Sequence, residues 1–456
     1  EVRNGGDLIV AGILEANASA TLEADFPPFE SPNSPTQRGG TVSILADTGG
    51  TISALNLLAL AEAESYSATA NAGTATGGSA LVAARNGGAI SLTGAAPIQS
   101  SISANGYGSA GAIASDAFGG TARLVAEDGS VTASHQVAVS ADGAVREYDS
   151  PAPSGDGFDA TGGTALVEIL AGASGTGTID ALQLAVRANG DARLFIVGTA
   201  SPASGEPIQG DGGQGQGGTA SASVAAGNLT ADALLVESAG IGGASAPSAT
   251  ATAFQSGNGT GGTSLLTTTG GTTTAPILEI LANGTGGGGT GSAGGGPDTA
   301  ALAGSGSGGA ATLSLAGGAL TATSSVQIAA SGTGADGMDH STGGLASNGG
   351  NGVGGNALIQ SVAGSTANFT TPSLTLTADG IGGNGGVSTG GTNGNGGTGL
   401  ATLAAAQFAD GRFTLGTAAL QANGLGGDGL TGGVGSGGQA AFSVIDTAGA
   451  TGPRTL

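Results

Sequence analysis

The feature of this sequence that most constrains its fold is a motif that repeats along the whole chain. Each copy opens with two glycines and an alternating run led by a small polar residue. Copies start at Gly39, Gly77, Gly119, Gly162, Gly217, Gly261, Gly308, Gly354, Gly396 and Gly437, with a looser copy at Gly5. The starts lie about 42 residues apart, a period typical of repeat architectures. The sequence therefore predicts about eleven similar units in one continuous array over residues 1–456.

The second half of each copy keeps a fixed spacing of apolar and small residues. They stand at offsets 2, 4, 7, 9 and 11 from an opening glycine, and a closing glycine follows at offset 13, as in Gly177–Gly190, Gly227–Gly240 and Gly271–Gly284. Alternation predicts strands, because every second side chain of a strand faces the same side. The three-residue step from offset 4 to offset 7 predicts a corner between two strands. With the opening run, such as "GGTALVEILA", each copy should hold three strands.

Small residues set the width of the predicted core. The chain has 96 glycines and 3% aromatic residues, which suits a thin interior and excludes a large aromatic one. Coils stacked ~4.8 Å apart would bury the apolar stripe of each coil on the next. We therefore expect an all-β parallel β-helix, a rod of roughly 50 Å. The closing glycine should supply a positive-φ turn. The variable glycine-rich intervals should be loops at one corner of the coil, which present ligands, act as spacers or pack on the neighbouring loop as a polyglycine-type layer.

Charge and residue usage exclude several classes of function. The nine cations are all arginine, against 32 acidic residues, and the net charge of −23 disfavours nucleic acid and anionic membrane surfaces. Without lysine, the glycine runs cannot be phosphate-binding P-loops. Without cysteine, disulfides, zinc–thiolate sites and thiol catalysis are excluded. No run of 18 apolar residues is present, so no membrane-spanning segment is expected.

Few residues suggest catalysis. Asp180 and Asp232 fall at outward offsets of adjacent copies, where a pair of carboxylates could resemble that of a glycosidase, but two solvated surface carboxylates are the simpler interpretation. His135 stands at an irregular corner and His340 in a glycine-rich interval, and both are expected at the surface. We predict that the chain is not an enzyme and has no catalytic, cofactor-binding or metal-binding residues.

Calcium is the one cofactor that the composition leaves open, because oxygen ligands are what the chain offers. Asp-Gly pairs recur at Asp142, Asp156, Asp336, Asp379, Asp410 and Asp428. Such pairs are typical of plain turns, and the tandem nine-residue motif of calcium-binding rolls is absent. We therefore expect no cofactor, with calcium as the alternative.

Outward threonines form the most regular surface feature. Thr51, Thr230, Thr272, Thr274, Thr321, Thr370 and Thr414 fall on equivalent strand positions, interrupted by Asp180, Asn228 and Arg412. A flat threonine ladder could bind ice, yet threonine is also favoured in strands for its packing. Glycosylation-type triplets at Asn17, Asn228, Asn258, Asn283 and Asn368 are expected by chance in such a composition.

The repeated glycine-to-glycine frame resembles the Gly/Ala/Thr-rich passenger repeats of filamentous haemagglutinin-like and autotransporter adhesins of Gram-negative bacteria, over nearly the whole chain. This resemblance implies a right-handed parallel β-helix, export to the cell surface, and a role in adhesion, aggregation or a biofilm matrix. The repeats here are longer than the compact coils of that family. Expected partners are other copies of the chain, end to end or side by side, or cell-surface glycans.

Two further expectations concern the ends and the loops. Both ends look uncapped, so we expect the natural chain to continue, with end-to-end polymerisation into a filament as the alternative. A polysaccharide-active β-helix enzyme is a further alternative. If any segment contacts a ligand, the glycine-rich intervals Gly284–Gly309 and Ile381–Gly397 are the first to consider.

Overall fold

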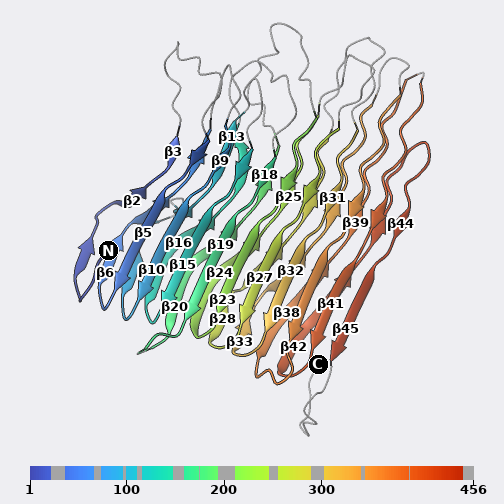
Figure 1. Cartoon of the computed structure of the whole chain (residues 1–456). Helices are drawn as coiled ribbons and strands as arrows, with labels where there is room; N and C mark the ends of the chain where they lie inside the picture. Colours follow the sequence, from blue (N-terminus) through green and yellow to red (C-terminus); the bar gives the residue numbers. More distant parts are fainter. Residues whose placement is uncertain are drawn as a thin grey trace, which may run out of the picture.

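The computed structural model describes residues 1–21, 36–65, 73–95, 99–109, 116–146, 159–173, 175–193, 211–245, 255–288, 302–339, 345–389 and 391–444. All helices and strands assigned in these residues are β-strands, with no helix among them. All pairings between the named strands are parallel. The strands form four sheets that run along one rod of stacked coils (Figure 1). The predicted parallel β-solenoid is confirmed.

Each coil begins in what we call the opening sheet. Its 10 strands are β5 (Thr41–Asp47), β10 (Ser79–Arg85), β15 (Thr121–Glu127), β19 (Thr164–Leu170), β23 (Thr219–Val224), β27 (Thr263–Thr268), β32 (Ala310–Leu315), β37 (Asn356–Ser361), β41 (Leu403–Phe408) and β45 (Gln439–Val444). Side chains alternate between core and solvent along these strands, except at positions such as Ala83, Val125 and Ala405, which are also buried. The opening strand is therefore present as predicted, except in the copies counted from Gly5 and Gly396.

The chain then turns into the bent sheet, whose strands carry the predicted corner. Its 15 strands are β1 (Asp7–Ile9), β2 (Ile13–Asn17), β6 (Thr51–Ala54), β7 (Asn56–Leu60), β11 (Ala89–Leu92), β12 (Ser100–Ser103), β16 (Ser130–Ser140), β20 (Gly177–Arg187), β24 (Gly227–Glu237), β28 (Thr272–Thr274), β29 (Ile277–Leu281), β33 (Ala319–Thr321), β34 (Ser325–Ala329), β38 (Asn368–Thr377) and β42 (Arg412–Gln421). In some coils the corner divides one long strand into two short ones.

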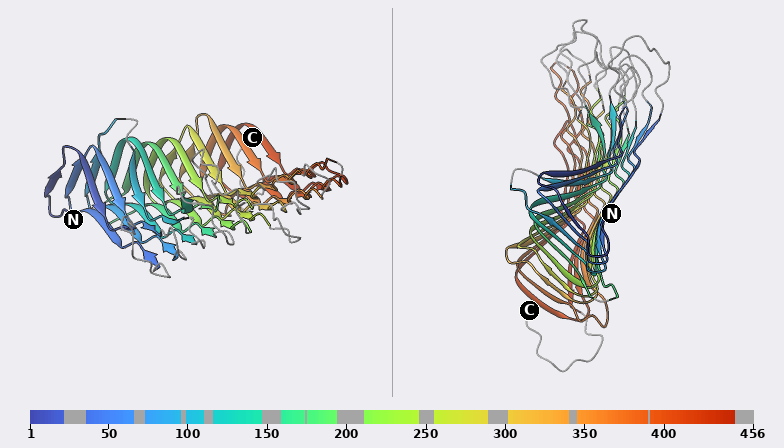
Figure 2. Two further views of the ribbon diagram at one scale, coloured as in Figure 1. Left: turned by 90° about the horizontal axis from the view of Figure 1, so that it is seen from above. Right: turned by 90° about the vertical axis from the view of Figure 1, so that its left-hand side faces the viewer.

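Two narrow sheets, which the sequence did not predict, complete the coil. The closing sheet holds β3 (Ala20–Thr21), β8 (Ala63–Glu64), β13 (Gly106–Ser109), β17 (Gly143–Arg146), β21 (Gly190–Asp191), β25 (Gly240–Ile241), β30 (Gly284–Thr285), β35 (Gly332–Thr333), β39 (Gly380–Ile381) and β43 (Gly424–Leu425). The return sheet holds β4 (Gln37–Arg38), β9 (Ala75–Thr76), β14 (Ala117–Phe118), β18 (Ala160–Thr161), β22 (Gly215–Gln216), β26 (Gly259–Thr260), β31 (Gly306–Ser307), β36 (Gly352–Val353), β40 (Gly399–Leu400) and β44 (Gly435–Ser436). Seen along the rod, the coil is broad at the opening and bent sheets and narrows toward these two sheets (Figure 2).

The register shows that one repeat makes one coil. Thr121 pairs with Ser79 of the preceding copy and with Thr164 of the following copy. Two predicted starts are displaced by this register. Gly5 lies in the corner before the bent sheet, where its backbone N–H donates a hydrogen bond to Thr48 O (3.1 Å). Gly399 pairs with Gly352, so the opening position of that coil is Ala401 and Thr402, five residues after Gly396.

The core follows the predicted offsets. Ile179, Ala181, Leu184, Val186 and Ala188 are between 0% and 4% exposed, and the copies from Gly227 and Gly271 repeat this burial. These side chains stack on their counterparts in neighbouring coils, for example Leu184 on Leu234. The core is therefore a continuous ribbon of aliphatic side chains along the rod.

The closing glycine has a different role from the one predicted. Positive φ angles occur at the opening glycine of several copies, for example Gly227 (96°) and Gly271 (73°), and not at the closing glycines Gly190 and Gly240. A Cβ on Gly190 would lie 2.1 Å from Gln216 O and 2.4 Å from Ala160 O. The prediction of a positive-φ turn there is wrong, because glycine is needed for the close approach of the closing and return sheets.

Candidate functional site

The narrow side of the coil extends into a double layer that we call the glycine wing. Its described residues are 211–214, 242–245, 255–258, 286–288, 302–305, 334–339, 345–351, 382–389, 391–398 and 426–434. From the end of β39 into the wing, burial has a period of three: Ile381, Asn384 and Val387 are exposed, whereas Gly382, Gly383 and Gly386 are buried. A period of three is that of the polyproline II conformation, in which glycine permits close packing of neighbouring segments.

Backbone hydrogen bonds join the two layers of the wing in a zigzag along the rod. The N–H of Gly243 donates to Gly213 O (2.8 Å), that of Gly257 to Gly243 O (2.8 Å), that of Gly287 to Gly257 O (2.9 Å) and that of Gly304 to Gly287 O (3.0 Å). The same pattern continues through Gly350, Gly383, Gly397 and Gly427. Within the intervals Gly284–Gly309 and Ile381–Gly397, the described residues 286–288, 302–305, 382–389 and 391–397 lie in this hydrogen-bonded layer, as the polyglycine-type alternative predicts, and the other described residues lie in or beside β30, β31 and β39.

Asparagine and aspartate side chains form ladders directly before the strands of the closing and return sheets. In each ladder the side-chain oxygen accepts the backbone N–H of the equivalent residue one coil later. Asn189 accepts from Ala239 (2.7 Å), Asn283 from Ser331 (2.8 Å) and Asn258 from Ser305 (2.7 Å). Two of the glycosylation-type asparagines are thus rungs of these ladders.

The aspartates of the Asp-Gly pairs take part in similar contacts. Asp336 accepts the N–H of Asn384 (2.7 Å), Asp379 that of Asn423 (2.7 Å) and Asp410 that of Gly364 (2.6 Å). The side chains of these aspartates thus bind backbone N–H groups, and Asp156 lies outside the described residues. Within the described part of the chain, no group of three or more histidine or carboxylate side chains is placed to hold a metal ion.

Asp142 occupies a position in one of these ladders between two asparagines, Asn105 of the preceding coil and Asn189 of the following coil. Its backbone N–H donates to Asn105 Oδ1 (2.7 Å), and the N–H of Asn189 donates to Asp142 Oδ1 (2.6 Å). Burial raises the pKa of Asp142 to about 6, although the Asn189 hydrogen bond and the charge of Arg187 act in the opposite direction. An amide accepts the same bond without a charge, so the contribution of this rung to stability depends on pH.

We expect Asp142→Asn to stabilise the rod at neutral pH and to change little near pH 4. A carboxyl with a higher pKa in the folded chain binds its proton more tightly there, so its contribution is complete at low pH and is lost as the pH rises through about 6. The difference from an ordinary aspartate corresponds to about 3 kcal/mol. Denaturant unfolding of both forms from acid to neutral pH measures it, and parallel pH profiles would contradict the prediction.

His135 is buried, so its predicted surface position is wrong. Its side chain is 0% exposed because two residues between Ala133 and Gln136 stand opposite one residue of the next coil. Nδ1 lies 3.1 Å from Gly94 O, which can only accept, so Nε2 accepts the Ser100 hydroxyl at 2.7 Å. This Ser–His pair is closed off from solvent. His340 lies outside the described residues.

The other residues singled out in the sequence stay on the surface. Asp180 is exposed on the bent sheet beside Thr230, and Asp232 is exposed at the corner, in a different column. Threonines of successive coils pair directly from Thr230 to Thr414, through Thr274, Thr321 and Thr370. Thr51 and Thr272 belong to the neighbouring column, as do Asn228 and Arg412. The threonine column is thus more continuous over these coils than the sequence indicated.

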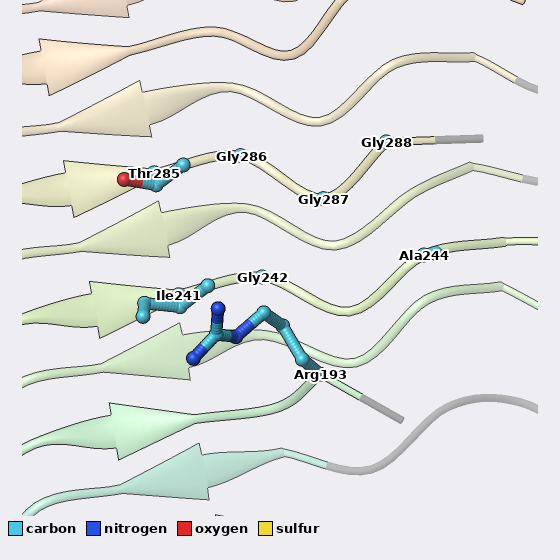
Figure 3. A pocket seen from close by; sticks show the side chains of 8 residues that line it. All are labelled: Arg193, Ile241, Gly242, Ala244, Thr285, Gly286, Gly287 and Gly288. Carbon is cyan, nitrogen blue, oxygen red and sulfur yellow. The ribbon is translucent and has the colours of Figure 1, made fainter. Parts of the chain in front are cut away.

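A shallow groove of about 360 Å³ lies on the closing-sheet side of the wing (Figure 3). Arg193, Ile241 and Thr285 line it together with Ala244 and the glycines 242 and 286–288. Asp191, Ile241 and Thr285 are aligned in successive coils. The Arg193 guanidinium donates to Asp191 from Nε to Oδ1 (2.9 Å) and from Nη2 to Oδ2 (2.6 Å). This hydrogen-bonded pair raises the pKa of Arg193.

Comparison with known proteins gives no match: no protein-family model fits the chain, and no curated protein or solved structure is detectably similar to it. The described residues contain no helix that is long and apolar enough to cross a membrane. Any functional inference therefore rests on the coil, the wing and the side chains that they present.

Proposed function

We propose that this chain is a non-enzymatic, secreted rod of the bacterial surface that serves as a stalk or fibre in adhesion, aggregation or a biofilm matrix. The observation that supports it is the uninterrupted stacking of one coil, with parallel ladders between successive coils in all four sheets. Such a solenoid is extended by adding further copies of one short repeat, and it presents long lateral surfaces. The glycine wing adds a second bonded layer along the same axis.

The Ser100–His135 pair and the two surface aspartates offer weak support for the enzymatic alternative. The pair is buried, and its imidazole is held by a carbonyl oxygen. Asp180 and Asp232 lie in different columns of the bent sheet and its corner. A mechanical and adhesive role uses what the chain has in abundance, namely repeated backbone ladders and small polar side chains.

Electron microscopy of the purified chain over a concentration series tests the proposal. We expect straight rods of roughly 50 Å, and beads coated with the chain should aggregate or adhere to cells. Rods that lengthen with concentration would favour the self-polymerising filament over the stalk. Globular particles, cleavage of polysaccharides or thermal hysteresis in the same preparation would overturn the proposal, the last in favour of ice binding by the threonine column.

A further inference from the structure

We infer that the groove at Arg193 is a binding site for a short neutral hexose oligosaccharide. The inference rests on the proposed function, because an adhesive rod needs a ligand-binding surface. Its volume of about 360 Å³ falls within the range of small-molecule sites. The groove lies beside β21, β25 and β30, which are central strands of the closing sheet, away from both terminal coils.

The polar groups of the groove match the hydroxyls of a sugar. A carboxylate accepts hydrogen bonds and a guanidinium donates them in a fixed fork, so Asp191 and Arg193 together present both functions at one place. The Arg193 side chain is 48% exposed, which leaves the pair accessible from solvent. Thr285 is exposed two coils along the same column and adds a hydroxyl that both donates and accepts.

The rest of the groove suits the apolar faces of a sugar ring. Ile241 stands between Asp191 and Thr285 in the aligned column, and Ala244 follows three residues later in the chain. Gly286 and Gly287 pack against neighbouring segments, where a Cβ would lie 2.1 Å from Gly304 O and 2.0 Å from Gly243 O, so they present only backbone to the groove. Gly242 N–H is bonded to Thr285 O at 2.9 Å. This lining N–H is therefore satisfied within the fold.

Charge selects a neutral ligand over an anionic one. Arg193 is the cation of the groove and is already paired with Asp191. Asp142, Asp191 and Glu237 contribute negative charge to the adjoining part of the coil, opposed by Arg187. The whole chain carries a net charge of −23. A phosphate, sulfate or uronate would meet this excess of negative charge, whereas a hexose exchanges hydrogen bonds without a charge penalty.

Saturation-transfer NMR and calorimetry with neutral gluco-, manno- and galacto-trisaccharides test the site. We expect one of these sugars to bind, and Asp191→Asn and Arg193→Gln each to weaken it at least ~10-fold, as for the loss of a hydrogen bond to a charged group. Gly288 lines the groove, so Gly288→Phe should abolish binding by filling it. The fold should tolerate this side chain, because a Cβ at Gly288 would meet nothing within 4 Å. Gly432→Phe is the matched control, because Gly432 in the wing is equally open.

Each result decides the inference. Loss of binding in Gly288→Phe and retention in Gly432→Phe would support the site. Equal binding by both, preference for a glucuronate disaccharide, or no binding of any trisaccharide at the highest soluble concentration would overturn it. Microscopy of the same samples separates the two proposals, since intact rods that bind no sugar contradict the groove alone, whereas samples without rods contradict the rod.

Discussion

Replacing Gly257 by alanine is expected to disrupt the glycine wing locally and to lower the free energy of unfolding by about 3 kcal/mol, the upper end of overpacking effects. The added Cβ would lie 1.7 Å from Gly213 O and 2.5 Å from Gly213 C. Both atoms are backbone, and neighbouring hydrogen bonds tie Gly213 to Gly243 and Gly243 to Gly257. No rotamer change can relieve the overlap, so the two layers must separate at this coil.

Gly288→Ala is the matched control for this prediction. Gly288 belongs to the same wing, has no positive φ, and leaves open space where its Cβ would stand. Alanine there should be neutral or slightly stabilising, by about 0.5 kcal/mol, through the unfolded chain. Hydrogen exchange of the wing amides and denaturant unfolding compare the two variants. Equal protection in both would mean that the wing layers are not in contact.

The coil was predictable because its information is local. Alternation and the three-residue step identify the inward residues of each copy without reference to any other copy, and Ile179, Ala181, Leu184 and Val186 are buried as expected. The stacking of copies follows from the repeat itself, since identical apolar stripes can only be buried on one another. Fold class and core therefore required only one repeat and its period.

The wing was expected only as one alternative, a polyglycine-type layer, and its hydrogen bonds were not predicted, because its stability comes from contacts between coils. A signal was present: segments such as "IGGNGGVS", beginning at Ile381, place glycine in a three-residue pattern that differs from the alternation of the strands. The role of each asparagine depends on the residue one coil later, for example Asn283 on Ser331. Composition alone made these segments look like loops.

His135 and the threonine column show the same limit on a smaller scale. The burial of His135 depends on a local register shift against the next coil, which the spacing within one copy does not encode. The division of the threonines into two columns likewise depends on which residues pair across coils, as Thr230 does with Thr274. Candidate sites on such a rod therefore depend on the register between coils. The Arg193 groove is formed by residues of three coils, so the sequence of one repeat could not predict it.

Leu184→Ala is expected to destabilise the rod by about 3 kcal/mol, as for other buried leucines, whereas Leu182→Ala should change stability by less than about 0.5 kcal/mol. Leu184 is 1% exposed and stacks on Val137 and Leu234, while Leu182, two residues earlier, is 41% exposed. Uninterrupted alternation from the inward Ala181 would turn both leucines outward. Only the corner brings Leu184 into the core, so the pair of variants tests that corner directly. Denaturant midpoints and hydrogen exchange of β20 measure the effect, and equally small losses in the two variants would mean that the strand runs straight.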